Sequence, residues 1–141
     1  MTNSIIVDSS ALFSIFSPSD TNHNIAKKIG LDIAKQAFSL IVPGEIFTET
    51  VNVLGKKINH QITSKYGSFI LTTEDYIIFE TTPQIRAEAF NKFQKQPRSV
   101  SFTDCLVMAF ADEFETKEIF GFDETFRKNG YIRFGIDKSK T

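Results

Sequence analysis

The chain has 141 residues and a formal net charge of −1, and its 41% hydrophobic residues include fifteen phenylalanines. This size and composition predict one domain over residues 1–141, with a core that forms without disulfides or a structural metal, and Cys105 is the only cysteine. No charged leader precedes an apolar stretch and no apolar run approaches ~18 residues, which argues against secretion and membrane insertion. We therefore expect a cytoplasmic protein that has no membrane partner.

The first half of the chain predicts two strands and three helices. Residues 4–7 (SIIV) predict a strand, and residues 9–16 predict a helix. The apolar stripe of the next helix repeats every four residues: Ile25, Ile29, Ile33 and Ala37. We expect these two helices to form a hairpin over the sheet. Residues 38–42 predict the second strand, and Pro43 is expected in the first turn of a third helix that reaches about His60.

The second half of the chain continues this alternation of strands and helices. It predicts a helix over 62–71, a strand at 76–80 (YIIFE), a helix from Thr82-Pro83 that ends before Pro97, an apolar helix from Ser101 to about Phe114, a strand over 118–122 and an edge strand over 131–134. Strands that alternate with helices are typical of an α/β protein with a parallel sheet.

Charge is distributed unevenly along the last third of the chain. From Asp104 to Glu124 there are seven acidic residues and one basic residue. From residue 127 onward there is one acidic residue, whereas five are basic: Arg127, Lys128, Arg133, Lys138 and Lys140. We interpret residues 135–141 as a basic tail that is either solvated or in contact with phosphate groups.

Four acidic residues occupy positions where a parallel sheet gathers its ligands. Asp8 and Asp123 each follow an apolar run directly, which is the carboxyl end of a strand in such a sheet. Glu49 lies in the helix after the second strand, on one face with Glu45. Asp104 lies on an apolar helix, and no cation stands at helical spacing from it.

Each of these acids also has a purely structural interpretation. Asp8 and Asp123 can cap a helix or turn, Asp104 stands three residues after Ser101 as in a capping box, and Glu49 can be solvated. Together, however, four carboxylates at one edge raise each other's pKa unless a cation lies between them. Mg²⁺ binds carboxylates together with phosphate oxygens, so a cluster without His or Cys indicates metal-assisted phosphate chemistry rather than a zinc site.

Other chemistries find less support in the sequence. His23 and His60 are not near a plausible nucleophile and form no ligand pair, so we expect them to be structural or solvated. Cys105 reads as a small buried apolar residue, and the seven glycines match no nucleotide-binding loop.

Four segments carry a resemblance to a known family: IIVDSSALF, LIVPGEIFTETVNVL, SFTDCLVMAFA and IFGFDETFRKNGY. In their order and spacing they resemble the PIN-domain family, and most of all the short VapC-like toxin ribonucleases of toxin-antitoxin systems. The resemblance spans nearly the whole chain and is weakest between Ile62 and Pro97. It implies a three-layer α/β/α domain with a central, mostly parallel sheet.

The resemblance also implies the residues of the site. Asp8, Glu49, Asp104 and Asp123 would hold Mg²⁺ or Mn²⁺ as catalytic and metal-binding residues, with supporting hydroxyls from Ser9, Ser10 and Thr103. Glu49 matches rather than Glu45, because it precedes the NVL segment. Many relatives carry a further acid where this chain has Thr125, which argues against a fully occupied second metal position.

The function that follows is a metal-dependent endoribonuclease, the toxin of a toxin-antitoxin pair. Arg127, Lys128 and Arg133 are its candidate RNA contacts, and the resemblance further implies a homodimer and a small antitoxin that blocks the acidic pocket. Two other functions stay open. A non-catalytic PIN-like module would bind RNA or protein, and a receiver-type phosphoacceptor would need an Asp where YIIFE offers only Glu80.

Overall fold

The computed structural model describes residues 3–138, which fold as an α/β domain around a five-stranded sheet. The strands are β1 (Ser4–Val7), β2 (Ser39–Pro43), β3 (Tyr76–Phe79), β4 (Glu118–Phe120) and β5 (Ile132–Arg133). The helices are α1 (Ser9–Phe16), α2 (His23–Lys35), α3 (Gly44–Lys57), α4 (His60–Thr72), α5 (Pro83–Gln94), α6 (Phe102–Glu113) and α7 (Glu124–Lys128). The sheet order is β3-β2-β1-β4-β5 and every neighbouring pair is parallel, which confirms the predicted fold class.

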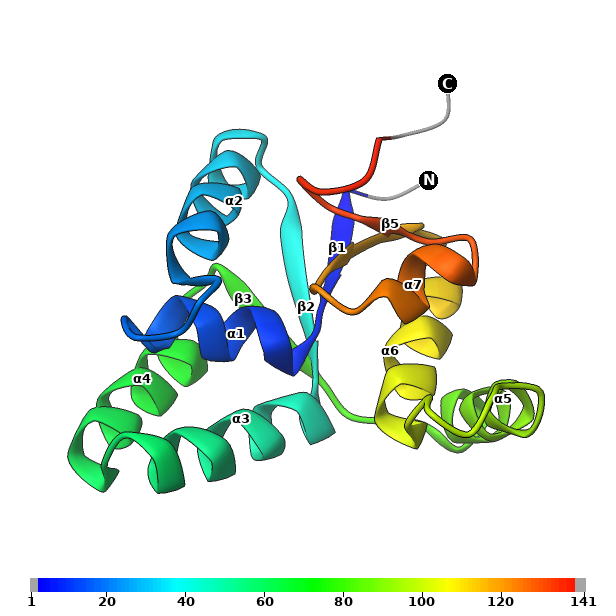
Figure 1. Ribbon diagram of the computed structural model, residues 1–141, viewed down its shortest axis with the longest axis horizontal. Coiled ribbons are helices and arrows are strands. Elements are labelled where there is room, and N and C mark those ends of the chain that lie inside the picture. Colours follow the sequence, from blue (N-terminus) through cyan, green and yellow to red (C-terminus); the bar gives the residue numbers. More distant parts are fainter. Residues whose placement is uncertain (1–2, 139–141) are drawn as a thin grey trace.

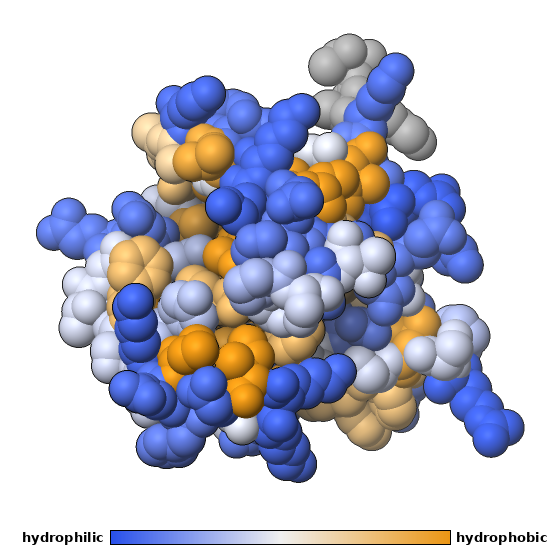
Figure 2. Space-filling view, turned by 60° about the vertical axis from the view of Figure 1, so that its left-hand side comes forward, coloured by the Kyte–Doolittle hydropathy of each residue, from blue (hydrophilic) through white to orange (hydrophobic). Residues whose placement is uncertain are grey.

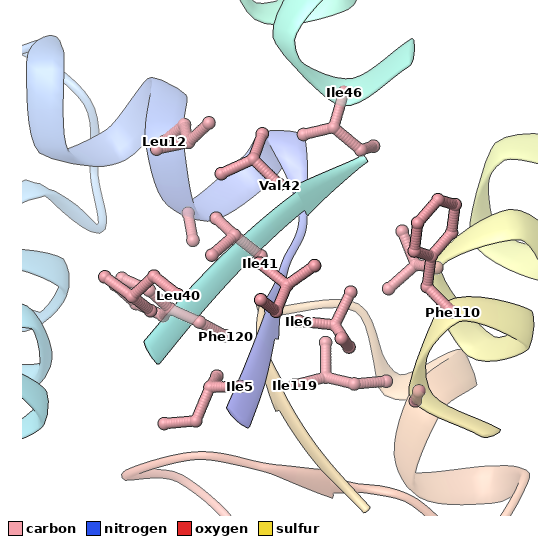
Figure 3. Packing of buried hydrophobic residues seen from close by; sticks show 14 of the residues in the cluster. Ile5, Ile6, Leu12, Leu40, Ile41, Val42, Ile46, Phe110, Ile119 and Phe120 are labelled. Carbon is pink, nitrogen blue, oxygen red and sulfur yellow. The ribbon is translucent and has the colours of Figure 1, made fainter. Parts of the chain in front are cut away.

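The sheet lies between two groups of helices. Figure 1 shows α1 to α4 on one side and α5 to α7 on the other, which is the expected three-layer arrangement. All four residues of β1 are buried, because a central parallel strand is covered by helices on both faces. In Figure 3, Leu12 of α1 and Phe110 of α6 pack from opposite sides against the aliphatic side chains of β1 and β2.

The parallel sheet sets the position of the site. β1, β2 and β4 all point their carboxyl ends to the same edge, and α1, α3 and α6 begin there (Figure 1). Asp8 continues the ladder beyond β1, since its amide donates to the Phe120 carbonyl over 2.9 Å. Side chains at the starts of these helices are therefore brought together although they are far apart in sequence.

Several predicted boundaries were wrong. Pro43 is the last residue of β2 and the N-cap of α3 rather than part of its first turn. α3 ends at Lys57, and His60 begins α4, whose N-cap Asn59 accepts a 2.7 Å hydrogen bond from the Ile62 amide. The last predicted strand pair also shortens, since β4 stops at Phe120 and β5 covers Ile132–Arg133.

The predicted stripe of α2 is correct only in part. Ile29 and Ile33 are buried together with Ala26, whereas Ile25 is 44% exposed. Ala37 lies beyond the helix and has a φ of 57°, in the left-handed region, so it ends the element rather than packing from it. Because the helix repeats every 3.6 residues rather than every four, its buried face includes Ala26 and leaves Ile25 partly exposed.

Hydrophobic side chains also remain on the surface. Figure 2 shows some of them low on the face that carries α3 and α4, surrounded by hydrophilic residues. On α4, Leu71 is 61% exposed and Phe69 46%. Within residues 3–138, the chain forms no helix with the length and apolar character needed to cross a bilayer.

Candidate active site

Asp8 is both a helix cap and a buried acid. It is the N-cap of α1, and its Oδ2 accepts hydrogen bonds from the Ser10 hydroxyl at 2.8 Å and the Ser10 amide at 3.4 Å. Its side chain is buried, and its pKa is raised from 3.8 to about 6. Burial is the main cause, the hydrogen bonds from Ser10 lower the pKa, and the charge of Asp104 raises it. The cap and the chemical interpretation therefore apply to the same carboxylate.

Asp104 begins α6 in the capping box expected from the sequence. The Asp104 amide donates to Ser101 Oγ at 3.1 Å, and the Ser101 amide donates to Asp104 Oδ2 at 3.3 Å. Burial raises the pKa of Asp104, and the charge of Asp123 raises it further. An ordinary capping carboxylate at a helix N-terminus is stabilised in its ionised form, so the nearby negative charge sets this one apart.

Asp123 is the N-cap of α7, a five-residue helix in the segment where the sequence indicates a turn. Its Oδ1 accepts a 2.9 Å hydrogen bond from the Thr125 amide, and its side chain is exposed. The charge of Asp104 raises the pKa of Asp8, and the charge of Asp123 raises the pKa of Asp104. The structure thus places Asp104 within electrostatic reach of both Asp8 and Asp123.

Glu49 lies in an adjoining hollow of about 930 Å³ that α3 forms with the ends of β3 and α6. Thr103, which directly precedes Asp104 in the chain, lines the same hollow. Glu45 also lines it, but its Oε1 accepts a 2.6 Å hydrogen bond from the Thr81 hydroxyl. Glu45 is therefore engaged in joining α3 to the segment after β3, whereas Glu49 is exposed.

The donor set fits a hard divalent cation. It consists of carboxylates and hydroxyls, and within residues 3–138 no salt bridge neutralises any of the four acids. Burial chiefly, and a neighbouring carboxylate in addition, raise the pKa values of Asp8 and Asp104, and a bound cation would offset both effects. Among the described residues, however, no three His, Cys, Asp or Glu side chains stand ready as a preformed metal group, so Glu49 and the aspartates would have to close on the ion.

The supporting hydroxyls and the histidines are also placed. Ser10 bonds Asp8 directly, whereas Ser9 only begins α1 and Thr103 faces the hollow. The His23 ring nitrogen Nδ1 lies 2.8 Å from the Ser14 carbonyl oxygen, and His60 is exposed at the start of α4. Cys105 is buried, as expected.

The three candidate RNA contacts, Arg127, Lys128 and Arg133, differ in exposure and in their bonding partners. Arg127 forms an exposed ion pair with Glu124 at 2.8 Å, and Lys128 is exposed. Arg133 is mostly buried, and its guanidinium bonds Asp137 and the Phe122 carbonyl. The Arg133 guanidinium is therefore engaged within the fold, whereas Arg127 and Lys128 are accessible.

The predicted basic tail is also partly structural. Ile136 packs against the core, and Asp137 holds Arg133, so residues 135–137 are integrated into the fold. Lys138 is exposed, and Lys140 lies outside the described residues.

Gly121 is a site residue that the sequence analysis missed. A Cβ built on it would lie 2.9 Å from the Asp8 Cβ and 3.1 Å from the Phe126 ring. Only glycine lets the chain after β4 approach Asp8 this closely. The signal in the sequence was a glycine between an apolar strand and Asp123.

Comparison with known proteins gives three results. The PIN domain matches residues 5–130 of this chain. No curated protein sequence matches it. Among solved structures, VapC20 of Mycobacterium tuberculosis, described as a toxin that cleaves the sarcin-ricin loop, superposes with a TM-score of 0.81 at 18% identity, over 92% of this chain and 97% of that one. At this identity the likeness is one of fold. Since the PIN domain match covers most of the chain, the chain belongs to the PIN domain family.

Proposed function

We propose that this protein is a metal-dependent endoribonuclease that hydrolyses RNA phosphodiester bonds. The observation that carries the proposal is that Asp8, Asp104 and Asp123 lie at the starts of α1, α6 and α7, and that Glu49 lines a hollow together with Thr103, the neighbour of Asp104. Membership of the PIN domain family and the fold shared with an RNA-cleaving toxin support the same function. Mg²⁺ or Mn²⁺ bound there would supply Lewis acidity that activates water and neutralises phosphate charge.

The chain's own residues would each contribute a distinct part. Asp8 would provide a buried carboxylate that a single hydroxyl, that of Ser10, keeps oriented. Asp104 and Asp123 would add charge from the starts of α6 and α7, and Glu49 would close the site from α3. None of these groups has to act as a nucleophile, because the attacking oxygen would come from water.

RNA cleavage in the presence and absence of metal tests this function. We expect a single-stranded RNA to be cleaved with Mn²⁺ or Mg²⁺, and cleavage to stop when a chelator removes the metal. RNA binding without cleavage at any metal concentration would favour the non-catalytic binding module. Phosphorylation of an aspartate by a small phosphodonor, again without cleavage, would favour the receiver-type domain.

We further propose that the ribonuclease is the toxin of a pair, acts as a homodimer and has a small antitoxin partner. The exposed hydrophobic side chains of α4 support a protein-protein contact, since such groups are usually covered in an assembly. Light scattering is expected to give a dimer. Co-expression with the product of a short neighbouring reading frame is expected to yield a stable complex that does not cleave RNA. A monomer at high concentration without such a complex would contradict the pair.

The end of the chain gives a prediction on RNA affinity. Changing Lys138 and Lys140 to Gln is expected to weaken RNA binding and to lower the salt dependence of log K by at most about 1.4, because two phosphate contacts are lost. The matched control changes Lys27 and Lys28 of α2 to Gln, which removes the same charge elsewhere. Equal effects of the two pairs would show that net charge matters and that the tail makes no local contact.

A further inference from the structure

Both backbone polar groups of Phe122, its amide and its carbonyl, are held by side chains. The Phe122 amide donates to Ser10 Oγ at 3.2 Å, and this hydroxyl donates to Asp8 Oδ2 at 2.8 Å. The Phe122 carbonyl accepts a hydrogen bond from Arg133 Nη1 at 2.9 Å. Phe122 directly precedes Asp123, so the backbone that carries Asp123 is connected to Asp8 on one side and to Arg133 on the other.

Arg133 is itself rigidly held. Its Nε and Nη2 donate to the two carboxylate oxygens of Asp137, both at 2.9 Å, and the two side chains are only 12% and 13% exposed. The Asp137 carboxylate also accepts a 3.0 Å hydrogen bond from the Arg133 amide. A planar guanidinium that is held in two-point contact with a carboxylate has little freedom, so its remaining nitrogen points in a fixed direction.

The Arg133–Asp137 pair is anchored to the sheet rather than to the surface. The Phe134 amide donates to the Ile119 carbonyl of β4 over 2.8 Å, and the Phe134 ring packs on Phe38. The pair therefore transmits the position of β5 to the segment between β4 and α7. The negative charges of Glu124 and Asp123 act on Arg133, and yet within residues 3–138 Arg133 pairs with neither of them.

We propose that Arg133 is a positioning residue, which aims Asp123 into the site through its hydrogen bond to the Phe122 carbonyl. This inference rests on the proposed function and reassigns a residue that the sequence suggested as an RNA contact. A purely structural ion pair would need only the Asp137 contacts. Arg133 makes a further contact, from Nη1 to the carbonyl oxygen of Phe122, the residue before Asp123. The amide of the same Phe122 donates to the Ser10 hydroxyl, which also orients Asp8.

Mn²⁺ binding by the full chain without RNA tests this proposal. Free Mn²⁺ is followed by electron paramagnetic resonance during titration of wild type and Arg133→Met, which keeps the apolar stem and loses all side-chain hydrogen bonds. We expect the dissociation constant to rise about 10- to 100-fold, as for other residues that orient metal ligands. In RNA cleavage, kcat is expected to fall while KM stays near the wild-type value.

The control variant is Lys92→Met, which breaks the ion pair of Lys92 with Asp112 (2.7 Å), a pair that makes no hydrogen bond to the four acids. It is expected to lower the melting temperature and to keep the wild-type Mn²⁺ affinity. If Arg133→Met fails to fold, Asp137→Asn decides, because it retains the guanidinium but weakens its anchor. We expect a smaller loss of Mn²⁺ affinity in that variant, again beyond the control.

The possible results separate the alternatives. Wild-type Mn²⁺ affinity in Arg133→Met, or in Asp137→Asn where only that variant folds, would overturn the proposal and leave Arg133 a stabilising residue. A salt-dependent rise in KM with unchanged Mn²⁺ affinity would also overturn it and restore the RNA contact. If wild type binds Mn²⁺ but cleaves no RNA, the proposed function fails and the positioning role is judged from Mn²⁺ affinity alone.

Discussion

Asp104→Asn is expected to reduce RNA cleavage by on the order of 100-fold or more, while the metal-free protein stays as stable as wild type or becomes more stable. The substitution keeps the size of the side chain, and its amide oxygen can still accept the hydrogen bond from the Ser101 amide. It removes a charge that raises the pKa of Asp8 and that is itself opposed by Asp123. Repulsion in the empty site falls, and so does the attraction for a cation.

The measurement is a melting series with and without Mn²⁺, run beside RNA cleavage. The stabilisation that Mn²⁺ gives to wild type is expected to shrink in Asp104→Asn, because metal binding to the folded state is weakened. Two variants separate the cap from the charge. Ser101→Ala removes the capping hydroxyl and is expected to cost about 1 kcal/mol of stability without loss of cleavage. Asp112→Asn removes a carboxylate from the same helix, at its ion pair with Lys92, and is expected to leave the metal response intact.

The opposite pattern would return Asp104 to a capping role. It would consist of a loss of metal-free stability similar to that of Ser101→Ala, an unchanged Mn²⁺ effect and cleavage at the wild-type rate. The site assignment would then lose its central acid, since Asp104 is the residue through which Asp8 and Asp123 are electrostatically connected.

The sequence located most of the candidate site because local rules act there. A strand that ends at an acid places that acid at the carboxyl edge of a parallel sheet, which is how Asp8 and Asp123 were found. Short-range hydrogen bonds made the capping motifs predictable, and the structure contains the caps Asp8 and Asp123 and the capping box of Ser101 with Asp104. These positions needed only the order of the strands and no knowledge of side-chain packing.

The features that the sequence did not reveal depend on contacts between distant segments. The bonds from Phe122 to Ser10 and to Arg133 span 112 and 11 residues, and no local pattern announces either. The same applies to the close approach of Gly121 to Asp8. Arg133 looked like a surface base because its partner, Asp137, lies in a segment that composition alone describes as a charged tail. Pairing and burial of a charge are decided by tertiary structure.

The contribution of Asp8 to the stability of the metal-free protein is expected to become less favourable as the pH rises from about 4 to about 6. The pKa of this carboxyl group is about 6 in the folded protein, whereas the ordinary value of an aspartate, which applies to the unfolded chain, is 3.8. Well below pH 3.8 the carboxyl group is neutral in both states and costs nothing. As the pH rises, the unfolded chain releases this proton first, so folding becomes less favourable until the folded group also ionises above pH 6. The difference from 3.8 to about 6 corresponds to about 3 kcal/mol.

Asp8→Asn isolates this contribution from the other titrating groups. Asn cannot ionise, but its side-chain oxygen can still accept the hydrogen bonds of Ser10. In the presence of a chelator, the unfolding free energy of the variant minus that of wild type is expected to increase by up to about 3 kcal/mol between pH 4 and pH 7. Denaturant unfolding at several pH values measures it. Asp137 acts in the opposite direction, since Arg133 lowers its pKa, but it is present in both proteins and cancels in the difference. A difference that stays constant over this range would show that Asp8 is solvated and ionised at its ordinary pKa. Asp8 would then carry no cost of ionisation in the folded protein that a bound cation could offset.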